Sequence, residues 1–140
     1  MPGASAPAAN YVPFVRAGDL LYISGQIAKP GAAAVRGLLG ETVTPEQGYA
    51  AAQGAALCVL AQMAAAVGDD LARVVRVVKL GVFIAATPQF NGQSQVANGA
   101  SDVLVAVLGD AGKHARTSVG VASLPLGAAV EVDAVVQIRG

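Results

Sequence analysis

Short β-type runs near the N-terminus predict a hairpin. The two runs are Val12–Arg16 and Leu20–Gln26, and the Ala17-Gly18-Asp19 segment between them has turn chemistry. Residues 1–10 are rich in Pro, Ala, Ser and Gly, which is typical of a loose lead-in. The segment Lys29–Gly40 contains one proline and several glycines and predicts a loop.

Apolar positions at three- and four-residue steps then predict a helix. Thr44 can cap it, Pro45 suits the first helical position, and Gln47 can complete a capping box. Gly68 marks the expected end. The stripe, in which Leu57, Leu60 and Ala64 are expected to pack on a sheet, consists of Tyr49, Gln53, Ala56, Leu57, Leu60, Met63, Ala64 and Val67.

The second half of the chain predicts a strand, a helix and two more strands. Val74–Ala85 is apolar on both alternating faces, as in a strand that is covered on both sides. A helix is expected from about Asn91 to Leu108, followed by strands at Ala115–Ala122 and Ala128–Ile138. In the last strand one face consists of Val130, Val132, Ala134, Val136 and Ile138.

The order ββαβαββ predicts an α+β fold, in which one mixed sheet carries two helices on one face. A chain of 140 residues fits one domain spanning residues 1–140. Two helices leave the other sheet face, with Val75, Val77 and Phe83 or their neighbours, in need of a cover. A second subunit is the simplest cover.

Composition supports that view of an oligomer. The chain is 54% apolar and 13% charged, about half the usual quarter of charged residues. The alternative is an Ala-rich composition inherited from a GC-rich genome. We favour an oligomer, because a small domain has too much surface to leave so few charges on it.

Charge and cysteine usage narrow the function classes. Nine basic and nine acidic residues balance to zero, which disfavours nucleic-acid binding. The single cysteine, Cys58, and the single histidine, His114, exclude an internal disulfide, a cysteine-based zinc site and a His-rich metal centre. Neither a signal peptide nor a membrane helix is evident, so a cytoplasmic protein is expected.

Charged side chains on the last two strands are the candidates for chemistry. Arg116 and Ser118 share one face of the first strand, while Glu131 and Asp133 share a face of the next. A hairpin between these strands would bring the four together, although the register cannot be derived from the sequence. Arginine suits a substrate carboxylate and a glutamate can accept a proton. A structural ion pair between Arg116 and a carboxylate of the same chain is the alternative.

Several motifs resemble the Rid family, also known as the YjgF or endoribonuclease L-PSP family. They are Leu20–Gln26 early in the chain, and Ala115–Val119, Leu124-Pro125 and Val130–Val132 late in it. The resemblance extends from about Tyr11 to Ile138. It implies a chorismate-mutase-like fold and a homotrimer whose sheets form a central barrel, with ligand clefts between subunits.

The resemblance also implies an activity, the hydrolysis of 2-imino or 2-enamino acids to 2-oxo acids and ammonia. Such imines leak from pyridoxal-phosphate enzymes. Arg116 would bind the substrate carboxylate and Glu131 would position the attacking water, with no metal or cofactor. The other residues implied at the cleft are Tyr11, Ser24, Gly25, Asn98 and, where many members have cysteine, Ser118.

Departures from the family pattern predict a divergent subgroup. Ala9-Asn10 replaces a Gly-Pro pair, Asn91–Gln95 is longer than in the deaminases, and Gly112–Ala115 is distinctive. Structural rather than catalytic roles are expected for three other residues. We expect His114 to be a loop or strand-edge residue and Cys58 to be a buried thiol. Lys79 is expected to form an ion pair or bind backbone carbonyls rather than act as a nucleophile.

Other functions are also open. A non-catalytic trimer could bind a small carboxylate metabolite through Arg116. The family's older label suggests a ribonuclease, but the neutral charge and the lack of a basic, aromatic-lined groove argue against it. Chorismate mutase shares the fold, but its substrate carries two negative charges and would need further cationic side chains in the cleft. Arg116 is the single cation nominated there, which argues against that activity.

Overall fold

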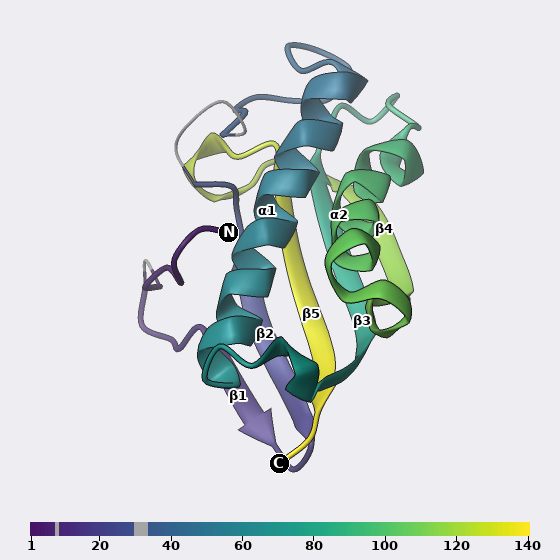
Figure 1. Cartoon of the computed structure of the whole chain (residues 1–140). Helices are drawn as coiled ribbons and strands as arrows, with labels where there is room; N and C mark the ends of the chain where they lie inside the picture. The colour runs from purple at the N-terminus through teal and green to yellow at the C-terminus, as the bar shows by residue number, and fades with distance from the viewer. Residues whose placement is uncertain (8, 30–33) are drawn as a thin grey trace.

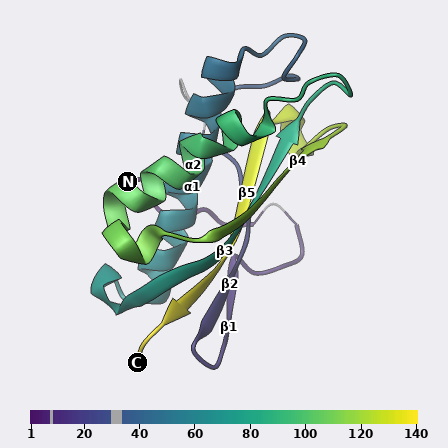
Figure 2. The same cartoon turned by 90° about the vertical axis from the view of Figure 1, so that its right-hand side faces the viewer.

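A five-stranded sheet with two helices on one face forms the centre of the molecule (Figures 1 and 2). The structure, a computed structural model, describes residues 1–7, 9–29 and 34–140. The elements in chain order are β1 Phe14–Ala17, β2 Leu20–Gln26, α1 Pro45–Ala66, η1 Leu71–Arg73, β3 Val74–Ala85, α2 Gln93–Leu108, η2 Gly109–Gly112, β4 Ala115–Val121, η3 Pro125–Gly127 and β5 Val130–Ile138. The predicted α+β class, element order and placement of both helices on one face are confirmed.

The strands lie in the order β1-β2-β5-β3-β4. All pairs are antiparallel except β3 and β4, which are parallel. The predicted hairpin between the last two strands is therefore wrong, because β3 lies between β4 and β5. The physical reason is the connection through α2, since a strand, a crossover helix and a strand place the two strands side by side and parallel.

Helix α1 begins as predicted. The Thr44 hydroxyl accepts a hydrogen bond from the Gln47 backbone N–H (3.1 Å), and the Gln47 side chain accepts one from the Thr44 N–H (2.9 Å). Pro45 occupies the first helical position, where a missing N–H has no cost. These contacts satisfy two backbone donors that the helix itself leaves unpaired.

The body of α1 is buried on more sides than one stripe predicts. Leu60 and Ala64 are buried as expected, whereas Leu57 is only partly buried. Close to α2, a Cβ on Gly99 would collide with the Tyr49 carbonyl oxygen and crowd the side chain of Ala52. The two helices therefore meet nearly backbone to backbone. α1 is also long and apolar enough to cross a membrane, but 61% of its most apolar window is buried inside the fold.

Apolar side chains are exposed on the sheet face away from the helices. Val15 and Tyr22 pair across β1 and β2, and both are exposed. Val119 on the edge strand β4 is also exposed and lies beside Phe83 of β3. Register shifts in β3 put Val77 under the helices instead, where it is fully buried. The sequence predicted an uncovered sheet face, and the strand register shows which side chains lie on it.

The N-terminal segment contacts the fold. Gln62 of α1 is fully buried, and its side-chain amide donates a hydrogen bond to the Ser5 carbonyl (3.0 Å). This bond fixes Ser5 over α1, so at least this part of the predicted lead-in has a defined place.

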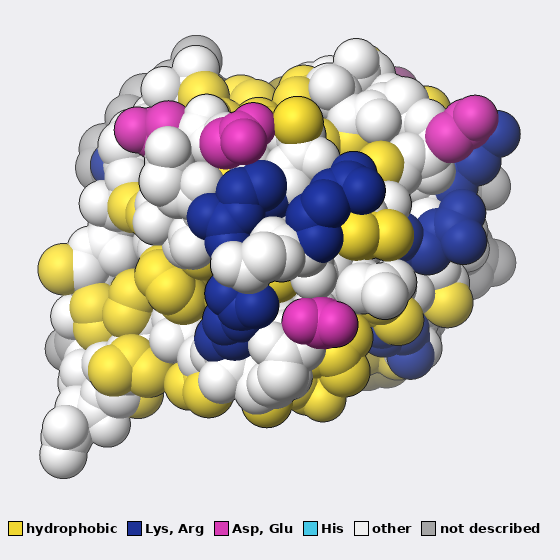
Figure 3. All heavy atoms as spheres, turned by 60° about the horizontal axis from the view of Figure 1, so that its bottom comes forward, with side chains coloured by type: hydrophobic (Ala, Val, Ile, Leu, Met, Phe, Trp, Pro, Cys, Tyr) yellow, Lys and Arg dark blue, Asp and Glu magenta, His cyan; other side chains and the backbone are white. Residues whose placement is uncertain are grey.

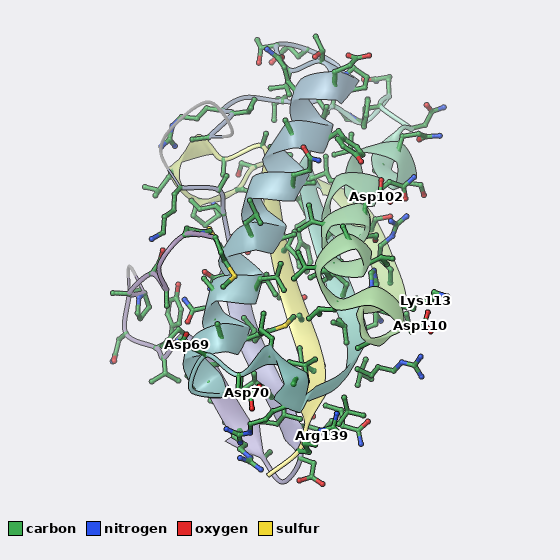
Figure 4. All side chains as sticks on the ribbon, viewed as in Figure 1. Asp69, Asp70, Asp102, Asp110, Lys113 and Arg139 are labelled. Atoms are coloured by element: carbon green, nitrogen blue, oxygen red, sulfur yellow. The ribbon has the colours of Figure 1, made fainter. Side chains whose placement is uncertain are left out.

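Arginines gather at the end of the molecule where the chain terminates. Figure 3 shows Lys and Arg side chains on this end with Asp and Glu among them, and Figure 4 labels Arg139 there. Arg73 donates to the carbonyls of Val67, Arg139 and Gly140, and Arg139 donates to that of Ala72. These guanidinium groups therefore bind the backbone of their own chain.

Candidate functional site

Arg116 lies on the edge strand β4 and faces the helices. It pairs with Leu80 and Ser118 pairs with Val82, and both β3 partners are buried beneath the helices. Its Nη1 donates to Asn98 Oδ1 (2.9 Å) and to Ser101 Oγ (3.1 Å), and its Nη2 donates to the Ser94 carbonyl (3.4 Å). Helix α2 thus holds the guanidinium by one side.

The remaining donors of Arg116 define what it can bind. A guanidinium has five N–H donors in a planar fork. Within the described residues three of them are used, which leaves Nε–H and one N–H of Nη2 without a partner. Two donors on a fixed planar group suit a carboxylate. The alternative of an ion pair within the chain is not found, since the described partners of Arg116 are an amide, a hydroxyl and a carbonyl.

His114 extends this hydrogen-bonded chain. Its Nε2 lies 2.9 Å from Ser101 Oγ and its Nδ1 lies 2.5 Å from the Gly112 carbonyl oxygen. The carbonyl can only accept, so Nδ1 donates to it, and in the tautomer that carries its proton there Nε2 accepts from the Ser101 hydroxyl. This orientation turns the oxygen lone pairs of Ser101 toward Arg116. His114 was predicted to be a loop or strand-edge residue, and it occupies the turn that leads into β4.

Glu131 and Asp133 lie on the opposite face of the sheet. Glu131 pairs with Phe83 and Asp133 with Gly81, both on the face away from the helices. Gly25 of β2 makes room for Glu131, because a Cβ there would stand 2.5 Å from the Glu131 Oε2. Arg116 and Glu131 of one protomer therefore do not meet, which corrects the expectation that both share one neighbourhood.

The environment of the two carboxyl groups raises the pKa of both. Burial raises the pKa of Glu131, and the negative charge of Asp133 adds to the rise. Burial also raises the pKa of Asp133, against the opposing effects of the Gly81 N–H and the Lys79 charge. A desolvated carboxylate is a stronger base than one in water. The charge of Lys79 thus lowers the pKa of Asp133, but among the described residues no ion pair or hydrogen bond of Lys79 is found, so the expected role of Lys79 stays a prediction.

A cavity of about 290 Å³ opens beside Glu131. Tyr11, Gly25 and Gln26 contribute to its wall, as do Ser5–Pro7 of the N-terminal segment and Leu126 of η3. Ser24 does not line it, since its hydroxyl donates to the Val12 carbonyl (2.8 Å). Ser24 therefore fixes the Tyr11 segment to β2 rather than facing the cavity.

The predicted site residues thus fall into two groups. Arg116, Asn98 and Ser118 lie on the helix side, with Asn98 in direct contact with Arg116. Tyr11, Gly25 and Glu131 surround the cavity. The sequence analysis missed Ser101, Gln26, Leu126 and the N-terminal wall. Ser101 follows Asn98 by one helical turn, a spacing that places both on one helix face and could have revealed it.

Metal-ligating and thiol chemistry have little basis in the described residues. No group of three or more His, Cys, Asp or Glu side chains converges there to hold a metal ion. Cys58 is buried as predicted, and burial raises the pKa of its thiol.

Comparisons with known proteins agree with this architecture. The sequence profile described as endoribonuclease L-PSP matches residues 2–138. Protein TCP17 of Trypanosoma cruzi is 53% identical over 141 residues, which cover 99% of this chain and 88% of TCP17.

Two solved structures show how the fold varies. Atu1372 of Agrobacterium tumefaciens, a protein of unknown function, superposes with a TM-score of 0.91 at 48% identity, covering 99% of this chain and 88% of its own. Escherichia coli YjgF gives a TM-score of 0.68 at 27% identity, covering 98% and 94%. The higher score with Atu1372 agrees with a divergent subgroup. With the profile matched over nearly its whole length, the chain belongs to the endoribonuclease L-PSP family, which includes YjgF.

Proposed function

We propose that this protein hydrolyses reactive 2-imino and 2-enamino acids to 2-oxo acids and ammonia. The observation that carries the proposal is Glu131, a half-buried carboxyl with a raised pKa beside a cavity of about 290 Å³. A carboxylate with a raised pKa accepts a proton from a bound water more readily than one in bulk solvent. Family membership and the two unpartnered donors of Arg116 support the assignment.

The reaction needs no redox step. Arg116 binds the substrate carboxylate, and Glu131 holds a water against the C=N carbon. The water oxygen bonds to that carbon as Glu131 accepts one water proton, and Glu131 then delivers this proton to the nitrogen to give the neutral carbinolamine. In the second half Glu131 accepts the hydroxyl proton and passes it to the leaving nitrogen, so that the C=O bond forms, the C–N bond breaks and ammonia departs. Positioning supplies much of the rate, because imines already hydrolyse in water.

A complete site requires two copies of the chain. Arg116 and Glu131 face opposite sides of the sheet, so one small substrate cannot contact both within one protomer. The uncovered face with Val15, Tyr22 and Val119 gives a second copy a surface to bury. We therefore propose a homotrimer with clefts between subunits, located in the cytoplasm where such imines arise.

Light scattering tests the assembly. The expected mass is three times that of the 13.8 kDa protomer at micromolar concentration. Each valine side chain that becomes fully buried contributes about 1.5–3 kcal/mol. A protomer mass at that concentration would contradict the trimer and with it the shared cleft.

Turnover is tested with imines formed in the cuvette. An amino-acid oxidase generates the 2-imino acid, semicarbazide traps it, and a hydrolase lowers the rate at which the semicarbazone forms. Wild-type protein should lower that rate in proportion to its concentration. Binding of 2-oxo acids without any effect on the trap would favour the non-catalytic binder instead.

RNA cleavage, which the family's descriptive name suggests, has weaker support. The net charge is zero, and the arginines at the chain end bind backbone carbonyls with Asp and Glu nearby (Figure 3). An RNA-binding surface needs basic groups that face phosphates.

A further inference from the structure

Leu126 adopts a backbone conformation that leucine rarely takes. Its φ is 59° and its ψ is 17°, in the left-handed region. Among the described residues other than glycine, only Asp69 also has a positive φ, and aspartate tolerates that region far better than leucine. The conformation therefore costs free energy that an asparagine or a glycine would largely avoid.

Hydrogen bonds on either side of Leu126 hold the turn in place. The Gly127 N–H donates to the Leu124 carbonyl, the Ala128 N–H to the Pro125 carbonyl, and the Gly37 N–H to the Gly127 carbonyl, each at 3.1 Å. All of these bonds join backbone groups. The turn thus does not need a leucine side chain, and glycine would suit its shape better.

The side chain of Leu126 explains why leucine is there. It is 68% exposed, a large value for a leucine, and it lines the cavity that contains Glu131. The apolar wall around it consists of Ala6, Pro7, Pro13, Ile27 and Pro125. An exposed apolar side chain held at a cavity mouth by a strained turn is a contact surface for something that enters the cavity.

The size of the cavity indicates what enters. Its volume of about 290 Å³ is roughly ten times the ~30 Å³ that one water occupies in the liquid. A three-carbon acid would leave much of that space, and the apolar wall, without contact. A longer branched side chain would cover Leu126 and the prolines and remove their apolar surface from water.

We infer that Leu126 selects substrates with a bulky apolar side chain. The inference rests on the proposed function, since it assigns the cavity to the side chain of the same 2-imino acid whose carboxylate Arg116 binds. The class that fits is a 2-imino acid with a branched aliphatic side chain, derived from an amino acid of the leucine kind. Leu126 is then a specificity-determining residue, separate from the groups that carry out hydrolysis.

Titration calorimetry with two stable 2-oxo acids tests this. Pyruvate and 4-methyl-2-oxopentanoate are titrated into wild type, Leu126→Gly and Leu126→Ala. Wild type should bind the branched acid more tightly. Both variants should lower the ratio of the two affinities by about tenfold, as expected when a pocket loses apolar contacts. Val107→Ala, at an exposed apolar position of α2 outside the cavity, should leave the ratio as in wild type.

Thermal melts separate the side chain from the backbone strain. Leu126→Gly should melt at the same or a higher temperature than wild type, because glycine suits a φ of 59°. Leu126→Ala keeps the strain and should melt below Leu126→Gly, although both have lost the contact. A shared fall in the affinity ratio therefore reports the side chain alone.

Three other outcomes would contradict the inference, and they differ in what they imply for the proposed function. Pyruvate binding with an affinity ratio that does not change in the variants would overturn the inference and leave the proposed function standing. A change of oligomer mass in the variants, without a change of ratio, would also overturn it by assigning Leu126 to a subunit interface. Failure of wild type to bind either acid would remove the proposed function and the inference together.

Discussion

The two halves of the proposed site differ in how their surroundings act on them. On the helix side, Arg116 donates hydrogen bonds to three acceptors on one helix, and these described contacts use three of its five donors. On the other face, Glu131 sits against glycine and apolar side chains, and burial raises its pKa. The surroundings of Arg116 fix the orientation of its guanidinium, whereas the surroundings of Glu131 remove its carboxyl group from water. A substitution should therefore affect each half in a different measurement.

The largest effect is expected on the desolvated side. Glu131→Gln keeps the shape but cannot accept a proton, so turnover in the semicarbazide assay should fall by about 10²–10⁴-fold. Affinity for 2-oxo acids should change much less, since Arg116 carries the carboxylate. Equal turnover in the two proteins would remove Glu131 from the chemistry.

The next effect is expected on the oriented side. Arg116→Lys keeps the charge but loses the planar fork. A hydrogen bond to a charged group contributes about 1.5–3 kcal/mol, so binding of 2-oxo acids should weaken by at least about tenfold. Melting should shift little, because Asn98 and Ser101 can then bond to water at this exposed edge. An unchanged dissociation constant by calorimetry would contradict the role given to Arg116.

A smaller effect tests whether orientation itself matters. Ser101→Ala removes one acceptor from Arg116 and breaks the link to His114. One hydrogen bond contributes about 0.5–1.5 kcal/mol, so affinity should weaken by about 2–10-fold. Tyr49→Phe is the matched control, as it removes a 2.6 Å bond to Asp102 on the same helix without touching Arg116. Equal losses in both variants would mean that general loosening of α2 is responsible.

The smallest effect is expected on how the free energy of unfolding depends on pH. Folding raises the pKa of Glu131 above its ordinary 4.5 and that of Asp133 above 3.8. The folded protein therefore binds more protons between each ordinary value and the raised one, and the free energy of unfolding should fall as pH rises through that interval. Urea unfolding at a series of pH values measures it, and the double variant Glu131→Gln, Asp133→Asn should show a flatter dependence. A steeper fall in the double variant would reverse the assignment.

Local sequence patterns predicted the helices and strands themselves better than they predicted which strands pair in the sheet. The capping box at Thr44 and Gln47 and the alternation along β5 were correct because they depend on residues close in sequence. The order of β3, β4 and β5 was missed, since pairing between distant segments leaves no local pattern. The β3, α2 and β4 connection nevertheless contained the answer, because such a crossover places its strands parallel and close together.

The site was predicted to a similar extent. Arg116 and Glu131 were nominated from the few charges on the last two strands, and Asn98 from the family resemblance. Their distribution over two sheet faces depends on register, which a shift of one residue would reverse. Leu126 could not be found as an unusual residue, because its positive φ results from the folded turn. Ser24 was assigned to the cleft through the family motif that it shares with Gly25, whereas in the fold its hydroxyl donates a hydrogen bond to the Val12 carbonyl.

Gly99 gives the α1–α2 contact a further meaning. It lies between Asn98 and Ser101 on α2, and the carbonyl of Tyr49 occupies the space that its Cβ would need. The spacing of the two backbones therefore sets where the α2 partners of Arg116 stand relative to α1. Gly99 has no side chain and takes no part in chemistry, yet its small size determines the position of the groups that hold Arg116. A larger residue at this position would displace α2 and so alter ligand affinity, without changing any group that a ligand touches.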